Sequence, residues 1–343
     1  MSLHFFDSIS SLAEYIHNYN TDQQVFVTES NCLTSCFERL PHPVQSQPYF
    51  CFPAGESHKS ISTYLEGIDF LTERHLDRST LIYTLGGGVT TDLGGFMAAT
   101  YKRGIRYINI PTSLMAMVDA AIGGKVGINH KHLKNYIGSF YHPQHVLICT
   151  DFLTSLPEKQ ILSGYAEVLK HGLIRDKSYW KQVRNIKPLQ LSANDWLPIV
   201  KRSTEIKTAI VNQDQHETGL RKILNFGHTV GHAFETHLLN EQREVPHGYA
   251  VAAGMICEAF LSHTVGQLKK DEMLEITHYI DSVYDRLPIT TNDCSALLEL
   301  MRFDKKNTSG SIQFALLSAI GSCSTTYNVS EKHILEALHF YLS

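Results

Sequence analysis

The sequence predicts a protein of two parts, an α/β half built on a parallel sheet followed by a mainly helical half. Three observations lead to this prediction. Short runs rich in β-branched and aromatic residues alternate with amphipathic stretches up to about residue 150. Beyond that point nearly every periodic segment has helical spacing, and the length of 343 residues is enough for two domains. We therefore expect one domain over 1–150 and a second over 151–343.

The first half alternates between expected strands and expected helices. Each strand is a short apolar run, and stretches of helical spacing separate the earlier runs. Such alternation is typical of a parallel sheet with helices on its faces. The expected strands are 25–28, 49–52, 81–85, 107–110 and 146–149, and the expected helices are 9–19, 58–75 and 92–101.

The second half is expected to be a series of helices with one interruption. A short β-hairpin is predicted at 312–317, which Gly321 follows. No internal repeat or low-complexity segment is visible, so the helices do not belong to a repeat array. The expected helices are 158–175, 178–186, 195–213, 228–240, 247–266, 270–285 and 330–342.

Composition and charge narrow the possible classes of function. Apolar residues make up 43% of the chain and the formal net charge is −4, so there is no basic field for nucleic acid or an anionic membrane. The best apolar run, 250–261, is too short to span a membrane, and residues 1–10 lack the pattern of a signal peptide. Seven cysteines without a C-x-x-C pair predict free thiols in a reducing cytoplasm.

Three histidines are the main candidates for chemistry. His228 and His232 are four residues apart, so on a helix they share one face. His247 opens a second segment, 247–254, whose small residues suit close helix packing. Imidazoles from two adjacent helices could converge on one metal ion if a further ligand comes from elsewhere in the chain. The alternative is a set of core histidines, and a nearby carboxylate would decide between the two.

A glycine-rich loop follows the strand expected at 81–85. Gly86, Gly87 and Gly88 lead into a helix, which places backbone N–H groups where a pyrophosphate can bind. The spacing is not the G-x-G-x-x-G of common dinucleotide sites, and glycine-rich turns also serve only to turn the chain. Glu56, after another strand, is a candidate acceptor for ribose hydroxyl groups, with a capped helix start as the alternative role.

Several separate motifs follow one another in an order that is found in a known enzyme family. They are 86–92, 102–104, 111–113, 118–119 with 123–125, 134–135, 166–170, Glu217 with Arg221, 225–232, 247–248 and 304–306. Together they resemble the 3-dehydroquinate synthase family, over about residues 50 to 310. The resemblance implies a Rossmann-like NAD-binding α/β domain and a mainly α-helical metal-binding domain, with the active site in the cleft between them.

The resemblance also implies an activity and its partners. The expected enzyme is a cytoplasmic homodimer with tightly bound NAD and one divalent metal ion, zinc or cobalt. It converts 3-deoxy-D-arabino-heptulosonate 7-phosphate to 3-dehydroquinate with loss of phosphate, in the shikimate pathway of aromatic amino-acid biosynthesis. The steps are oxidation at C4, phosphate elimination, re-reduction, ring opening and intramolecular aldol closure.

The same resemblance assigns metal and cofactor positions. It makes Glu167 the third metal ligand beside His228 and His247, whereas His232 faces the substrate phosphate. Two imidazoles and a carboxylate leave coordination positions for substrate oxygens. The implied NAD positions are Glu56, Lys59, Gly87, Gly88, Val89, Asp92, Thr112, Ser113, Lys125, Lys134, Phe152, Ser155, Leu156 and Gln160.

The implied substrate residues must hold a phosphate, a carboxylate and the C4 hydroxyl. Asp119 resembles the carboxylate near that hydroxyl, and Lys170 follows Glu167 by about one helical turn, on the same side. In the family the substrate phosphate is thought to take the proton during its own elimination, so no separate protein base is required. The phosphate contacts are Lys125, Asn135, His232, Lys305 and, from a second subunit, Arg103; the carboxylate contacts are Lys207 and Arg221 with Glu217 near them; Lys134 and Asn225 complete the set.

Three alternatives remain open at this point. Other sugar-phosphate cyclases share the scaffold but tend to change the residues at the positions of Asn225 and His232, which are both retained here. Metal-dependent polyol dehydrogenases typically have Ala-Lys after the aspartate of the glycine loop, where this chain has Leu93 and Gly94. A catalytically inactive binding protein is expected to have lost metal ligands or cations.

Overall fold

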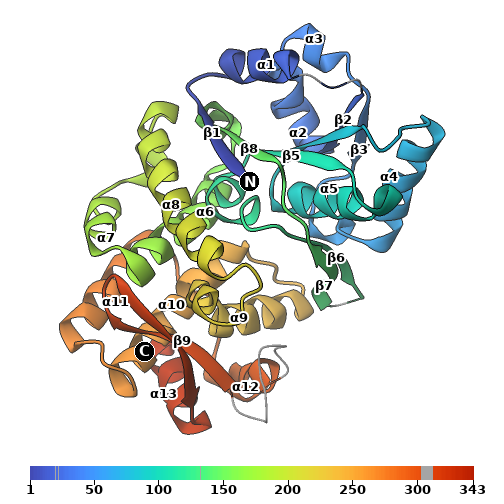
Figure 1. Cartoon of the computed structure of the whole chain (residues 1–343). Helices are drawn as coiled ribbons and strands as arrows, with labels where there is room; N and C mark the ends of the chain where they lie inside the picture. Colours follow the sequence, from blue (N-terminus) through green and yellow to red (C-terminus); the bar gives the residue numbers. More distant parts are fainter. Residues whose placement is uncertain (20, 22, 132, 303–311) are drawn as a thin grey trace. The chain divides into compact units, whose positions relative to one another are not determined.

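The chain forms two compact units in the computed structural model, which describes residues 1–343 apart from 20, 22, 132 and 303–311 (Figure 1). Unit 1 comprises Met1–Ile161 and Gln190–Thr204. Unit 2 comprises Leu162–Leu189 and Glu205–Ser343. These limits differ from the expected domains, 1–150 and 151–343, because unit 1 extends beyond residue 150 and a later segment returns to it.

Unit 1 is built on a six-stranded parallel sheet with the strand order β1-β8-β5-β4-β2-β3. All five expected strands are confirmed. The edge strand β1 was not expected from the sequence, because its residues are partly exposed and do not form a buried apolar run. The strands are β1 (Ser2–Phe6), β2 (Gln24–Glu29), β3 (Tyr49–Phe52), β4 (Leu81–Gly86), β5 (Arg106–Pro111) and β8 (His145–Cys149).

The inner strands of this sheet are apolar on both faces, because each face is covered. Val25, Val27 and Ile82 lie in the core that α4 and α5 cover, whereas Phe26 stacks on Tyr83 with ring centroids 5.0 Å apart. Helix α5 begins earlier than the expected residue 92, and the short helices α2 and α3 were not expected. The helices are α1 (Ile9–Asn18), α2 (Ser30–Ser35), α3 (His42–Gln45), α4 (Ile61–Glu73) and α5 (Gly88–Thr100).

A β-hairpin that the sequence analysis did not predict packs on this core. Its strands are β6 (Lys125–His130) and β7 (Leu133–Phe140), which pair antiparallel. Val126 and Ile128 of β6 join the core, whereas β7 is mostly exposed and has no apolar run for periodicity to detect. Gly95 of α5 permits the close approach, since a Cβ there would lie 2.5 Å from Cγ1 of Val126.

Unit 2 is mainly helical and contains one antiparallel hairpin, β9 with β10, which confirms the hairpin expected at 312–317. Helix α9 packs against α10 and α12, and α10 also contacts α11, α13 and β9. Helix α12 was not expected. Helices α6 and α8 each begin in unit 1. The elements from α6 onward are α6 (Glu158–Arg175), α7 (Lys177–Val183), α8 (Ala193–Gln213), α9 (His228–Asn240), α10 (His247–Thr264), α11 (Lys270–Val283), α12 (Cys294–Arg302), β9 (Ile312–Ala319), β10 (Ser322–Val329) and α13 (Glu331–Leu342).

Two expectations from composition can be compared with the structure. All seven cysteines are free thiols, five of them buried, as expected from the lack of a paired motif. Among the described residues, no helix has both the length and the apolar character that a membrane span needs.

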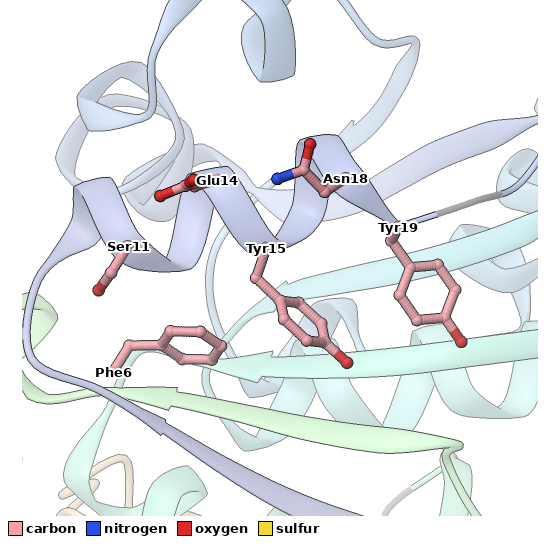
Figure 2. A pocket seen from close by; sticks show the side chains of 6 residues that line it. All are labelled: Phe6, Ser11, Glu14, Tyr15, Asn18 and Tyr19. Atoms are coloured by element: carbon pink, nitrogen blue, oxygen red, sulfur yellow. The ribbon is translucent and has the colours of Figure 1, made fainter.

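A surface pocket of about 410 Å³ lies in unit 1 beside α1 (Figure 2). The ring of Tyr15 projects from α1, and the ring of Tyr19 projects from the residue that follows the helix, both on the side where Phe6 lies. No residue that the sequence analysis assigned to cofactor, metal or substrate lines this pocket, so it is not the candidate active site. The lining residues are Phe6, Ser11, Glu14, Tyr15, Asn18 and Tyr19.

Candidate active site

The glycine loop lies in unit 1, where β4 ends and α5 begins. Gly87 immediately precedes α5 and Gly88 is its first residue. Gly86 cannot carry a side chain without movement, since a Cβ there would lie 2.4 Å from Oγ1 of Thr90. The backbone N–H of Thr112 donates to the Gly86 carbonyl over 3.0 Å and so fixes the next loop beside the first. The loop therefore leads directly into a helix N-terminus, the arrangement that suits a phosphate group.

A buried lysine joins several of the expected residues of unit 1. Lys59 is 3% exposed, and its Nζ lies 2.5 Å from Oδ2 of Asp92 and also donates to Oδ1 of Asn135. Asn129, which the sequence analysis missed, extends this network. Its side chain donates to Oε1 of Glu56 over 2.8 Å and accepts the backbone N–H of Asn135 over 2.8 Å. The β6–β7 hairpin is thereby connected to the loop after β3 and to α5.

The other expected residues of unit 1 differ in exposure. Thr112 is buried, with its Oγ1 3.4 Å from Sγ of Cys32. Phe152 is wholly buried, so its ring is part of the protein core. The exposed residues are Arg103, Lys125, Lys134, Asn135, Ser155 and Gln160, and the half-buried ones are Glu56, Gly87, Gly88, Val89, Asp92, Ser113, Asp119 and Leu156.

Glycines permit close packing of the helices that carry the metal candidates of unit 2. A Cβ at Gly248 of α10 would lie 1.9 Å from the carbonyl oxygen of Ser163 in α6. A Cβ at Gly254 would lie 2.0 Å from the carbonyl oxygen of Gly227, the residue that precedes α9. The close packing expected from the small residues of 247–254 is confirmed. The metal candidates carried by these three helices are Glu167, His228, His232 and His247.

A wholly buried carboxylate belongs to this group. Glu167 is 0% exposed, with Oε1 3.5 Å from Nε2 of His228, and Oε2 is paired with Nζ of Lys170. Apart from that ion pair, neither carboxylate oxygen has a hydrogen-bond partner among the described residues. A buried carboxylate is costly unless cationic charge compensates it, so this donor set suits a metal cation.

The three histidines gather beside that carboxylate. Nitrogen atoms of His228, His232 and His247, one from each ring, all lie within 4.8 Å of one another. The ring centroid of His228 is 5.3 Å from that of His232 and 5.4 Å from that of His247. The predicted shared face of His228 and His232 is confirmed. Distance alone therefore allows either His232 or His247 to join His228 at a metal ion.

Acceptors behind these imidazoles were missed by the sequence analysis. Nδ1 of His228 lies 3.2 Å from the carbonyl oxygen of Phe226, and Nδ1 of His247 lies 3.1 Å from Oε2 of Glu235. The wholly buried Glu258 of α10 secures the start of α9. A single acidic residue within the apolar run of α10 is a sequence signal that could have identified Glu258. The backbone N–H donors to Glu258 are those of Gly227 at 2.7 Å, Thr229 at 3.0 Å and Val230 at 3.1 Å.

The residues expected to bind the substrate carboxylate are cations buried in unit 2. Lys207 is 4% exposed and Arg221 is 2% exposed. Glu217, with φ of 59°, accepts a hydrogen bond of 2.7 Å from the side-chain amide of Asn225. These two residues, which the sequence analysis assigned separately, therefore pair directly. Lys305 lies outside the described residues.

Asp214 organises the turn that leads to Arg221. Its carboxylate accepts backbone N–H donors from Thr218, Gly219 and Arg221 over 3.0, 2.7 and 3.0 Å. Partial desolvation raises the pKa of Asp214, but these donors together outweigh it and lower the pKa to about 2. The turn is thus held by an ionised carboxylate.

Comparison with known proteins divides the chain near residue 163, close to the first boundary between the two units. A family model described as 3-dehydroquinate synthase N-terminal matches residues 49–163, and one described as 3-dehydroquinate synthase C-terminal matches residues 164–307. The 3-dehydroquinate synthase of Parabacteroides distasonis is 40% identical over 338 residues, which cover 98% of this chain and 96% of the relative. That of Rippkaea orientalis is 41% identical over 325 residues, which cover 93% and 85%.

Solved structures confirm the predicted fold class. A 2-deoxy-scyllo-inosose synthase complexed with carbaglucose-6-phosphate, NAD+ and Co2+ has a TM-score of 0.87 at 23% identity, and covers 98% of this chain and 95% of its own. A 2-epi-5-epi-valiolone synthase from Streptomyces hygroscopicus with NAD+ and Zn2+ bound has a TM-score of 0.86 at 24% identity, with coverage of 100% and 97%. At these identities the structures establish the fold alone. With both family models matched and relatives at 40% identity over nearly its full length, the chain belongs to the 3-dehydroquinate synthase family.

Proposed function

We propose that the protein converts 3-deoxy-D-arabino-heptulosonate 7-phosphate to 3-dehydroquinate and phosphate. It is then a carbon–oxygen lyase, whose product is an intermediate of aromatic amino-acid biosynthesis. Family membership supports this reaction. The structural observation that carries it is the buried Glu167 carboxylate, which lies between the imidazole of His228 and the ammonium group of Lys170. Polyol dehydrogenases share the fold class, so the substrate has to be tested directly.

The proposed metal ligands are Glu167, His228 and His247, for zinc or cobalt. Two neutral imidazoles and one carboxylate suit such an ion, and coordination positions remain for substrate oxygens. When bound, the metal would lower the pKa of a coordinated hydroxyl group, and NAD would supply reversible hydride transfer. His232 is close enough to be an alternative ligand. We assign it to the substrate phosphate, because a neutral imidazole or its imidazolium form can donate to phosphate oxygens.

The proposed NAD site uses the loops of unit 1. The backbone of Gly87 and Gly88, at the N-terminus of α5, is proposed to bind the pyrophosphate. Lys59 holds Asp92 by its ion pair, and Glu56 offers a carboxylate to ribose hydroxyl groups. The other proposed contacts are Val89, Thr112, Ser113, Lys125, Lys134, Phe152, Ser155, Leu156 and Gln160. Phe152 is assigned through its backbone, since its side chain is wholly buried.

The proposed substrate contacts are mainly positively charged side chains that bind the negatively charged groups of the substrate. Lys207 and Arg221 bind the substrate carboxylate, and the guanidinium of Arg221 can do so in bidentate geometry. Asp119 orients the C4 hydroxyl, and Lys170 acts beside the metal ligands. The departing phosphate is bound by Lys125, Asn135, His232 and Lys305, and by Arg103 of a second subunit, so we also propose a homodimer in the cytoplasm. Sedimentation analysis of the purified protein tests the dimer.

A product assay tests the proposed reaction. Purified protein with NAD and zinc or cobalt should release phosphate from the heptulosonate phosphate and form 3-dehydroquinate in equal amounts. Folded, metal-replete protein that forms neither product would contradict the proposal. NAD-dependent oxidation of glycerol in place of this reaction would favour a polyol dehydrogenase, and turnover of glucose 6-phosphate would favour another sugar-phosphate cyclase.

Two histidine variants test the assignment of ligands. His247→Ala should lose the bound metal, because a ligand is removed. His232→Ala should keep one metal ion per chain and lose turnover, because only phosphate binding is removed. Metal content by atomic emission and turnover are measured on the same samples. Equal loss of metal in both variants would overturn the assignment and favour a site formed by three histidines.

A further inference from the structure

Glu235 is a buried carboxylate that contacts a proposed metal ligand. It lies on α9, is 8% exposed, and places Oε2 3.1 Å from Nδ1 of His247, the first residue of α10. No role was assigned to it by the sequence analysis.

The partner of each imidazole determines where its proton lies. An ionised carboxylate only accepts hydrogen bonds, so the contact with Glu235 requires a proton on Nδ1 of His247. In the neutral imidazole the lone pair then lies on Nε2, the atom that can bind a metal. His228 is arranged in the same way, because its Nδ1 faces the carbonyl oxygen of Phe226 and its Nε2 faces Glu167. Both histidines thus present Nε2 as the ligating atom.

The two orienting acceptors differ in kind. The acceptor behind His228 is a backbone carbonyl, fixed by the turn that precedes α9. The acceptor behind His247 is a side chain, so its charge and position depend on one residue. A carboxylate behind an imidazole holds the ring and makes its ligating nitrogen more basic, which strengthens metal binding.

We propose that Glu235 is a positioning residue, which holds His247 in the tautomer protonated at Nδ1 and so increases the affinity of the site for a divalent metal ion. The proposal rests on the proposed metal site. The tautomer itself can be measured without metal, substrate or turnover, so failure of the proposed reaction and failure of this inference are distinguishable.

Nitrogen NMR of the metal-free protein, labelled with 15N-histidine, tests the tautomer. The signal of His247 is identified by its disappearance in His247→Asn. In the unmodified chain it should be that of the Nδ1-protonated form. Glu235→Met, which removes the acceptor at similar volume, should give a mixture of tautomers. Glu235→Gln keeps an acceptor oxygen and should largely keep the tautomer. An Nε2-protonated ring in the unmodified chain would overturn the proposal, even if Glu235→Met does not fold.

Zinc affinity, measured by competition with a chelator, provides the second readout. Glu235→Met should weaken binding by about 10- to 100-fold, and Glu235→Gln should weaken it less, because the charge is lost but the acceptor remains. Glu331→Gln is the matched control, since Glu331 is exposed at the start of α13 and contacts Arg302 instead. Unchanged zinc affinity in a folded Glu235→Met protein would contradict the proposal.

Discussion

The two units assemble their candidate residues in different ways. In unit 1 the candidates follow the carboxyl ends of strands, since Gly86 ends β4, Thr112 follows β5 and Glu56 follows β3. Parallel strands bring those ends to one edge of the sheet, where ligands of α/β proteins usually bind. In unit 2 the metal candidates come from three helices, of which α6 is distant in the sequence from α9 and α10, and glycines permit their close packing. Sheet topology therefore positions the candidates of unit 1, and helix packing positions the metal candidates of unit 2.

Both units contain a buried lysine–carboxylate pair, and the pair in unit 2 is more deeply buried than the pair in unit 1. The side chains of Lys170 and Glu167 are 1% and 0% exposed. Those of Lys59 and Asp92 are 4% and 19% exposed, so water can solvate the aspartate. Removal of the lysine should therefore lower the free energy of unfolding more in unit 2 than in unit 1.

The largest effect is expected from Lys170→Met. It leaves the Glu167 carboxylate buried without its ammonium partner, which should lower the free energy of unfolding by about 3–5 kcal/mol in EDTA. Saturating zinc should reduce that loss, because the bound ion compensates the same carboxylate. Denaturant unfolding with EDTA and with zinc provides the measurement.

Lys177→Met is the control for that experiment. The Lys177 ammonium lies 2.9 Å from Oε1 of Glu272, but the lysine side chain is 55% exposed. The free energy of unfolding should therefore change by no more than about 0.5 kcal/mol. Equal losses for Lys170→Met with and without zinc would show that the lysine and the metal do not compensate the same charge.

Gly254→Ala is expected to lower the free energy of unfolding by about 3 kcal/mol, a smaller loss than that of Lys170→Met. The new Cβ would lie 2.0 Å from the carbonyl oxygen of Gly227, and relieving this overlap requires movement of the backbone of α10 or of the turn before α9. Metal content should fall with stability. Gly231→Ala places a Cβ 2.9 Å from the carbonyl oxygen of Ala250 and should cost less. Full stability and full metal content in both variants would show that the metal candidates are positioned without close packing at these glycines.

The contrast between the units also explains what the sequence could predict. The strand, glycine loop and helix start are contiguous, so 81–92 indicated a phosphate site from local pattern alone. His228 and His232 were predicted on one face because helical spacing determines it. No local rule connects Glu167 with His247, so that assignment came from family resemblance. Hairpin strand β7 and the polar contacts of Asn129 escaped prediction because exposed strands and paired amides have no periodic signal.

In unit 1 the corresponding variant is Lys59→Met, which should lower the free energy of unfolding by about 2 kcal/mol. The loss is smaller than for Lys170→Met because Asp92 is partly solvated and its ion pair is weaker than a fully buried one. NAD affinity should fall as well, because Asp92, Asn135 and the β6–β7 hairpin lose a common donor. Calorimetric titration with NAD and metal analysis measure the two sites separately. Loss of metal along with NAD would show that the sites are not assembled independently.

The smallest effect is expected at Asp214, where the turn before Arg221 depends on an ionised carboxylate. Its pKa of about 2 lies below the ordinary value of 3.8, so folding favours the ionised form. That contribution is complete above about pH 4 and is lost as the pH falls toward 2. Asp214→Asn should remove this part of the acid dependence and destabilise the turn at neutral pH, because the amide is a weaker acceptor for three backbone donors. Stability profiles of both proteins from pH 6 to pH 2 should therefore converge at the acid end. Parallel profiles would show that the carboxylate does not titrate in this range, and the turn would then depend on packing, as the helices of unit 2 do.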